Sequence, residues 1–370
     1  MNTANPGNTL RGFDLAESER RFEAWWAGGV LDRPPVRFSI ATQRQAERPP
    51  LPESTRERWM DPGFAVANGL AWVAENDWFA DSAPIYMPNL GPDLTGTLFG
   101  CELEFGADTS WSTHPVASEE DYERIAESAP NFANPYWLAL EKMTRLSLKA
   151  PGGHLTGITD LHGSADTLVS LRGPEDLCYD LVDFPELVHR VLAVLAETNC
   201  EIFCRSRSLL QEGGQSISTT WAAFLHRGPA YISSADILAL LSPEMAREFV
   251  LPYLRLEWAD IERSIFHLDG PDALRHIEWI LEEDWIQAVQ WVYGAGQGRA
   301  SDWIDIYKKI RAAGRSLQLL AIDAEDALTV LRAIGPEGVW VEINGSRFAA
   351  EQEAAAFLDA VHDLCGTRAG

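Results

Sequence analysis

Short apolar runs rich in β-branched and aromatic residues alternate along this sequence with amphipathic stretches of helical periodicity. Parallel β–α units produce this pattern. Eight runs are strand candidates: residues 34–40, 78–87, 154–159, 216–221, 264–269, 288–294, 316–322 and 339–345. A count of eight favours a closed (β/α)8 barrel, so the expected fold class is α/β with a single TIM barrel.

Helix signals follow the last four strand candidates. Pro271 and Asp323 are typical of helix starts, and Gly314 and Gly335 are typical of helix ends. The expected helices cover residues 271–283, 302–313, 323–334 and 349–364. We therefore expect one barrel domain over residues 31–370, preceded by an N-terminal extension over residues 1–30.

The charge of the chain restricts its partners. Its 370 residues carry a formal net charge of -25 at pH 7, which argues against nucleic acid and against an anionic membrane surface. No apolar run approaches the roughly 18 residues of a membrane-spanning helix, and the N-terminus lacks the apolar core of a secretion signal. We therefore expect a cytoplasmic protein that acts on a small molecule.

Several familiar motifs are missing from the sequence. The five cysteines are an odd number without a Cys-x-x-Cys pair, so neither a disulfide framework nor a zinc ribbon is indicated. No G-x-G-x-x-G follows a strand candidate and opens a helix, and there is neither a Walker lysine nor a Gly-x-Ser-x-Gly elbow. We therefore expect no nucleotide cofactor.

In a barrel of this type the active site is built at the C-terminal strand ends, and here several of these ends are polar. The side chains concerned are Asp160 and His162, His267 and Asp269, Trp291 and Tyr293, and Glu342 and Asn344. Alternate residues of a strand point to the same side, so His267 and Asp269 share one side. Histidine and carboxylates that converge can bind a divalent metal of the zinc or manganese type, or act as a general acid/base pair.

Each of these residues also has a structural interpretation. Asp269 can cap the next helix while His267 is a satisfied core residue, and Asp160 and His162 can belong to a loop turn. Glu342 can be a rim charge paired with a basic residue. The tryptophans are mostly packing residues, although a few at strand ends, such as Trp291, can line a pocket for a flat or methylated ligand.

One segment carries a family resemblance. Residues 231–270, YISSADILALLSPEMAREFVLPYLRLEWADIERSIFHLDG, resemble the segment of the uroporphyrinogen decarboxylase-like superfamily in which an acidic strand end leads to Leu-Ser-Pro-Glu, a helix and a His-x-Cys-Gly-like turn. Residues 22–40 and 163–192 are similar to other parts of the same superfamily. The resemblance extends over about residues 20 to 365. It implies a barrel with a small-molecule substrate in its mouth, with Asp236 in the acidic strand end as a substrate-binding candidate.

The superfamily includes zinc-dependent methyltransferases that serve corrinoid proteins and coenzyme M, and the chain departs from their pattern. His267 matches their His-x-Cys motif, but Asp269 stands where the cysteine would be, and Asn344 or Gly345 lies near the second cysteine position. A thiolate-rich zinc site is therefore absent. A harder site made by His267 and Asp269, with Glu342, Asp160 or His162 as further donors, can still hold a divalent metal. The resemblance also implies a corrinoid protein as a partner.

The decarboxylase pattern is incomplete as well. The chain resembles it at Arg33-Pro34-Pro35-Val36, but the arginine loop that binds substrate carboxylates is replaced by RFSIATQRQAER. Under this interpretation Arg33, Arg37 and Arg44 bind carboxylates, and Asp81 stabilises a protonated intermediate.

The sequence therefore favours a diverged methyltransferase-like or lyase-like enzyme, in which His267 and Asp269 bind a divalent ion or polarise the substrate. One alternative is a decarboxylase of a carboxylated tetrapyrrole or smaller acid. A second alternative is a catalytically silent barrel that binds a corrinoid or a metabolite. The oligomeric state stays open, with a homodimer as one option.

Overall fold

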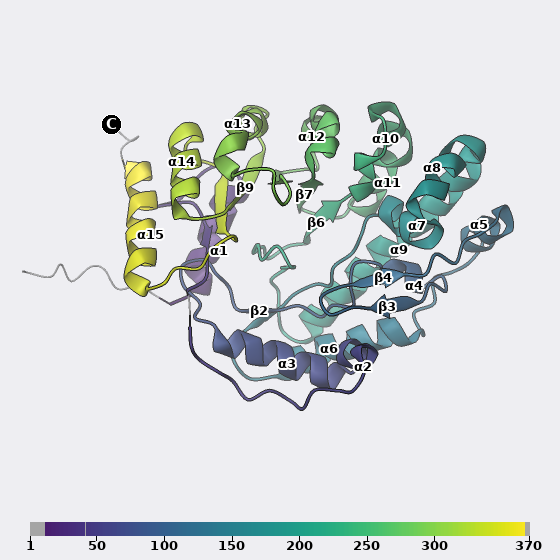
Figure 1. Ribbon diagram of the computed structural model, residues 1–370, viewed down its shortest axis with the longest axis horizontal. Helices are drawn as coiled ribbons and strands as arrows, with labels where there is room; N and C mark the ends of the chain where they lie inside the picture. Colours follow the sequence, from purple (N-terminus) through teal and green to yellow (C-terminus); the bar gives the residue numbers. More distant parts are fainter. Residues whose placement is uncertain (1–11, 41, 367–370) are drawn as a thin grey trace, which may run out of the picture.

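A parallel sheet of six strands forms the centre of the computed structural model, which describes residues 12–40 and 42–366. The order across this sheet is β1-β10-β9-β8-β7-β6. The strands are β1 (Val36–Arg37), β6 (Ala230–Ser234), β7 (Arg263–Asp269), β8 (Ala288–Val292), β9 (Ser316–Ala321) and β10 (Val339–Ile343). In Figure 1 helices α10 to α15 form an outer layer along the outside of this sheet.

Two short parallel strands, β2 (Ile85–Tyr86) and β5 (Leu155–Thr156), form a separate pair. Backbone hydrogen bonds next to this pair connect it to the neighbouring segments. Before β2, the Asp81 N–H donates to the Val36 carbonyl of β1 at 3.1 Å, and after β5, the Ile158 N–H donates to the Thr219 carbonyl at 2.8 Å. The arrangement is barrel-like, but in the described part of the chain the strand ladder does not close. Prolines before β1 and β2 lack the N–H that a longer ladder needs.

The prediction of a strand at residues 216–221 was wrong. Within that segment the structure has only an isolated antiparallel bridge between Ser218 and His226, and the strand lies instead at β6. The sequence of β6, AYISS, is short and contains two serines, so its strand signal is weak. All five residues are nevertheless buried, because tertiary packing encloses both faces of the strand.

The helices expected after the last four strands are confirmed. The first is split into η2 (Pro271–His276) and α12 (Ile277–Glu282). The others are α13 (Ile304–Ala312), which η3 (Ala300–Trp303) precedes, α14 (Ala324–Ile334) and α15 (Glu351–Gly366).

The first two thirds of the chain add further helices and a β-hairpin. The helices are α1 (Leu15–Trp26), α2 (Thr55–Met60), α3 (Pro62–Glu75), α4 (Leu94–Thr97), α5 (Glu119–Ala126), α6 (Pro135–Lys149), α7 (Ser164–Arg172), α8 (Pro174–Asp183), α9 (Pro185–Glu212), η1 (Asp236–Ala239), α10 (Pro243–Phe249) and α11 (Leu251–Glu257). The hairpin consists of β3 (Leu103–Phe105) and β4 (Ser110–Ser112). No helix in residues 12–40 and 42–366 combines the length and the apolar character needed to cross a membrane.

Helix α1, which lies in the expected N-terminal extension, packs at the N-terminal end of the sheet. The indole N–H of Trp25 donates to the Leu317 carbonyl at 3.1 Å, and that of Trp26 donates to the Leu225 carbonyl at 3.1 Å. The ring of Trp25 lies 5.5 Å from that of Trp340, which is fully buried. These rings form an inner hydrophobic core that fills one end of the strand arrangement, separate from the larger core between sheet and helices.

Candidate functional site

A row of polar side chains crosses the inner face of the sheet, with one residue from each of five adjacent strands. His267 Nδ1 makes a short hydrogen bond with Gln290 Oε1. Gln290 Nε2 donates to Gln318 Oε1 at 2.8 Å, and Gln318 Nε2 donates to Glu342 Oε2 at 2.9 Å. Arg37 donates to Glu342 Oε1 at 2.7 Å. The row lies one layer above the inner core, because these positions alternate with outward residues along each strand.

Three side chains meet where this row reaches the C-terminal end of β7. Ligand atoms of Asp236, His267 and Asp269 all lie within 4.8 Å of one another. His267 and Asp269 share the inner face of β7, and Asp236 follows β6 at the first residue of η1. Strand β7 ends at Asp269, and the φ of 81° at the following Gly270 lets the chain turn away before Pro271. The Trp221 ring packs edge-on against His267 at 5.3 Å.

A histidine and a buried carboxylate lie beside this cluster. His162 Nδ1 is 3.3 Å from Asp93 Oδ1, and its Nε2 is 3.9 Å from Asp236 Oδ2. Burial alone would lower the pKa of His162, but the hydrogen bond with Asp93 and the charges of Asp166 and Asp236 raise it to about 9. His162 is therefore mostly protonated at neutral pH.

Two further carboxyl groups have perturbed pKa values. Burial raises the pKa of Asp160, although His162, His267 and the Trp221 indole favour its charged form. Burial also raises the pKa of Asp269, where the attraction of His267 is opposed by the repulsion of Asp236. Perturbed groups gathered around a cavity are typical of a functional site.

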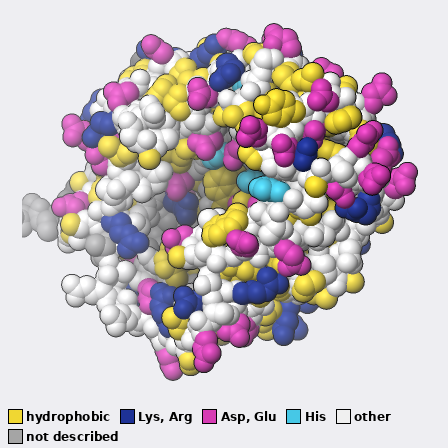
Figure 2. All heavy atoms as spheres, turned by 45° about the vertical axis from the view of Figure 1, so that its right-hand side comes forward, with side chains coloured by type: hydrophobic (Ala, Val, Ile, Leu, Met, Phe, Trp, Pro, Cys, Tyr) yellow, Lys and Arg dark blue, Asp and Glu magenta, His cyan; other side chains and the backbone are white. Residues whose placement is uncertain are grey.

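A cavity of about 360 Å³ opens beside the cluster, and Asp236 belongs to its wall. Its lining has three carboxylates, from Asp93, Asp166 and Asp236, but no lysine or arginine. The apolar part of the wall comes from Trp111, Val169, Pro174, Ile237 and Leu240. Figure 2 shows a hollow on this side of the molecule, with histidine and acidic side chains near it. The cavity suits a small molecule with an apolar body and no strong negative charge.

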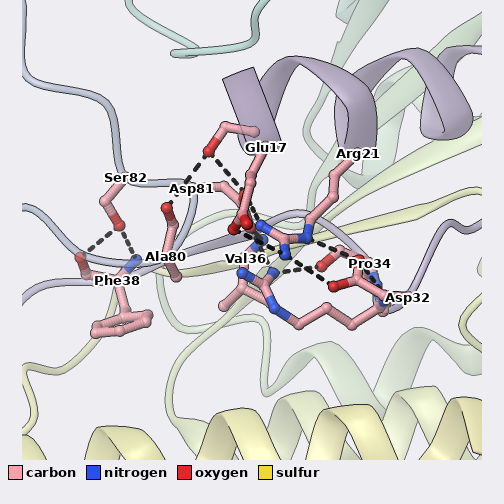
Figure 3. A network of polar contacts seen from close by, with 11 residues as sticks. Glu17, Arg21, Asp32, Pro34, Val36, Phe38, Ala80, Asp81 and Ser82 are labelled. Atoms are coloured by element: carbon pink, nitrogen blue, oxygen red, sulfur yellow. Dashed lines mark hydrogen bonds and ion pairs between the residues drawn. The ribbon is translucent and has the colours of Figure 1, made fainter. Parts of the chain in front are cut away.

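Asp81, expected at the mouth, lies at the opposite end of the strands, beside α1 (Figure 3). Arg33, which was expected there too, is ion-paired with it. Asp81 is almost completely buried and its carboxylate is fully occupied. It makes a short ion pair with Arg33 and accepts from Arg21 at 3.2 Å, from the Ser18 hydroxyl at 2.9 Å and from the Val36 N–H at 2.9 Å. This network ties α1 to β1, so the geometry does not support a catalytic role for Asp81 or substrate binding by Arg33.

The other two expected arginines are also ion-paired. Arg37 pairs with Glu342 inside the sheet, and Arg44 pairs with Asp77 at the surface. Glu342 lies at the far end of the polar row and does not belong to the group of Asp236, His267 and Asp269. The geometry therefore does not support Glu342 as a direct metal ligand.

Trp291 and Tyr293 lie on the other face of β8 from Gln290. The Trp291 ring is fully buried, 5.3 Å from Trp303, and the Tyr293 hydroxyl donates to the Leu320 carbonyl at 3.1 Å. Both pack in the layer between sheet and helices, because odd and even positions of a strand point to opposite sides. They do not line the mouth.

Sequence reasoning missed Gln290, Gln318, Asp93, Asp166 and Trp111. The two glutamines did carry a signal, since each is the single polar side chain of its type within an apolar run, AVQWV or LQLLA. A buried glutamine must find hydrogen-bonding partners, so such a position indicates a polar contact between strands. The other three residues lie outside the strand ends and carried no comparable signal.

Comparisons with known proteins find similarity to solved structures. No family model matches the sequence, and no curated protein matches it either. A solved structure of a methyltransferase from Methanosarcina mazei superposes with a TM-score of 0.60 over 94% of this chain and 99% of that chain. The chain therefore shares the fold of that structure. Because the two sequences are 14% identical, this similarity concerns the fold alone.

Proposed function

We propose that this chain is a diverged methyltransferase-like enzyme that binds a divalent metal ion through Asp236, His267 and Asp269. The observation that carries the proposal is the convergence of one imidazole and two carboxylates within 4.8 Å at the C-terminal end of the sheet. The methyltransferase-type fold, which extends over nearly the whole chain, supports the reaction class at a coarse level.

The donor set fits a metal of intermediate or hard character. One imidazole nitrogen and two carboxylate oxygens suit zinc, manganese or iron, whereas a thiolate-rich site would favour softer ions. A metal held here would act as a Lewis acid that makes a coordinated thiol, hydroxyl or amine a better nucleophile. Among the described residues no cysteine belongs to this group.

The remaining polar residues have roles that follow from their positions. Protonated His162, held by Asp93, is placed to stabilise negative charge or to supply a proton beside Asp236. The apolar wall of the adjoining cavity takes the body of the substrate and excludes water from it. A corrinoid protein is the methyl carrier that we propose, on the basis of the family resemblance.

The cavity also bears on the choice of substrate. Three carboxylates outnumber the protonated His162 in the lining, which has no lysine or arginine, and this favours a neutral or cationic small molecule. The decarboxylase interpretation required arginines free to bind substrate carboxylates, and Arg33, Arg37 and Arg44 are each engaged by an acidic side chain. We therefore do not advance that function.

Metal content tests the proposal. Purified protein is loaded with Zn²⁺ or Mn²⁺, desalted and analysed for metal, alongside the His267→Ala and Asp269→Asn variants. We expect about one equivalent in the unmodified protein and a loss of orders of magnitude in affinity in both variants. Asp272→Asn is the matched control, because Asp272 is highly exposed and lies just three positions beyond Asp269.

A second measurement concerns the reaction itself. Methyl transfer from methylcobalamin to thiol and amine acceptors is followed with the metal-loaded protein. Failure of every tested divalent ion to bind would overturn the metal site. Activity that survives in metal-free protein and is lost in His267→Ala would instead favour the acid/base alternative for His267 and Asp269.

A further inference from the structure

The row of side chains that ends at His267 has a fixed direction of hydrogen bonding. We propose that Gln290, Gln318 and Glu342 form a positioning relay that sets the tautomer of His267, with the proton on Nδ1 and the lone pair of Nε2 free at the mouth. The inference rests on the proposed function for the use of that lone pair. The tautomer itself does not depend on the proposed function.

The direction originates at Glu342. An ionised carboxylate only accepts hydrogen bonds, and Arg37, which only donates, holds one of its oxygens at 2.7 Å. The other oxygen must therefore face a donor. The neighbouring group is the Gln318 amide at 2.9 Å, so its NH₂ group points to Glu342. The opposite orientation would place two acceptors against each other.

The orientation of Gln318 determines that of Gln290. With its NH₂ group committed to Glu342, Gln318 presents its carbonyl oxygen to β8, where Gln290 Nε2 donates to it at 2.8 Å. Gln290 then presents its own carbonyl oxygen to His267 Nδ1. Both glutamines are almost completely buried, with exposed fractions of 2% and 0%. Since no bulk water reaches them, a reversed amide would leave unpaired polar atoms.

His267 is the last residue in this row of hydrogen bonds. A carbonyl oxygen opposite Nδ1 requires that Nδ1 carries a proton, so the neutral ring keeps its lone pair on Nε2. The Trp221 ring, packed edge-on at 5.3 Å, restrains rotation of the imidazole. Nε2 is then the nitrogen available to bind an ion or to accept a proton beside Asp236 and Asp269.

Strand register makes the relay possible. His267 is in register with Gln290, Gln290 with Gln318, and Arg37 with Glu342. Gln318 is in register with Trp340, so it reaches diagonally to Glu342, two residues further along the same face of β10. Within the row each side chain hydrogen-bonds only to its neighbours, so along the row a change at Glu342 reaches His267 through the two glutamines.

The test is a direct measurement of the tautomer. Protein labelled with ¹⁵N-histidine, freed of metal by chelation, is studied by long-range proton–nitrogen correlation, which distinguishes the two neutral tautomers. His267→Asn identifies the signals of His267 among the eight histidines of the chain. We expect the neutral His267 ring to carry its proton on Nδ1 rather than on Nε2. A neutral ring with its proton on Nε2 and none on Nδ1 in the unmodified protein would overturn the relay, whether or not the protein binds metal.

A variant tests the role of Glu342. Glu342→Gln is nearly isosteric, but its amide can donate as well as accept, so the direction of the row is no longer imposed. We expect a mixture of His267 tautomers and a Zn²⁺ affinity about 10- to 100-fold lower, as for other residues that orient a ligand. Glu278→Gln, the same change at an exposed position, is the control. An unchanged tautomer in Glu342→Gln would remove Glu342 from the relay. A correct tautomer without any metal binding would leave the relay standing and refute the proposed function.

Discussion

The carboxylate of Asp166 accepts the backbone N–H groups of Asp236 and Ile237, at 2.8 and 2.9 Å. Asp166 lies on α7 and is almost completely buried, whereas the side chain of Asp236 is 51% exposed. The start of η1, and with it the direction of the Asp236 side chain, is therefore fixed through the backbone. Asp166 also lines the cavity, so it joins the cavity wall to a proposed metal ligand.

Replacement of Asp166 is expected to weaken metal binding. Asp166→Ala leaves two N–H groups without their acceptor and lets Asp236 move, so we predict a Zn²⁺ affinity about 10- to 100-fold lower by isothermal titration calorimetry. Asp176→Ala, on the exposed side of α8, is the control. Unchanged affinity in Asp166→Ala would show that Asp236 is either positioned independently or is not a ligand.

Asp81 is expected to matter for stability alone. Asp81→Asn leaves the buried Arg33 without its counter-charge and removes one of the carboxylates paired with Arg21, so we predict a loss of about 3 to 5 kcal/mol in the free energy of unfolding by urea denaturation. Zn²⁺ affinity of the folded variant should be unchanged. Arg44→Ala, which removes an exposed ion pair, should cost under about 0.5 kcal/mol. Loss of metal by a stable Asp81→Asn protein would contradict the placement of Asp81 away from the mouth.

The inner core predicts a second large effect on stability. Trp340→Ala removes a fully buried ring that contacts Phe22 and Trp25 of α1, so the free energy of unfolding should fall by about 3 to 5 kcal/mol. Trp72→Ala, at a position 43% exposed, should cost much less. Similar losses in the two variants, measured by chemical denaturation, would mean that α1 does not pack as described.

The buried Glu257 should make the free energy of unfolding depend on pH. Burial raises its pKa from 4.5 to about 8, although the Ser164 N–H donates to Oε1 at 2.6 Å and favours the charged form. Between these two values the folded state retains a proton that the unfolded state has lost. The contribution of this group to stability therefore falls as pH rises, by up to about 1 kcal/mol per pH unit, and levels off above the folded pKa.

Glu257→Gln tests this dependence, because glutamine keeps an acceptor for Ser164 but does not titrate. Between about pH 5 and about pH 8, the free energy of unfolding of Glu257→Gln should fall less steeply than that of the unmodified protein. Glu282→Gln, an exposed position on α12, is the control. Parallel pH profiles for the unmodified protein and Glu257→Gln would show that Glu257 is ionised in the folded state.

Much of the fold could be predicted from local patterns. The last four β–α units were predicted in order, because each strand and helix carries its own periodicity and its own start and stop residues. Strand β6 was missed, since its short sequence has a weak pattern and its burial depends on neighbours far along the chain.

The candidate site divides in a similar way. That His267 and Asp269 share one face could be predicted from the sequence, because the alternation of side chains along a strand is a local property. The three-dimensional structure was needed to show that Asp236 joins them, that hydrogen bonds through two glutamines connect Glu342 to His267, and that Asp81 lies at the opposite end. These relations depend on strand order, register and the end of the sheet to which each loop returns. Such properties arise from packing between distant segments, so no pattern within a single segment encodes them.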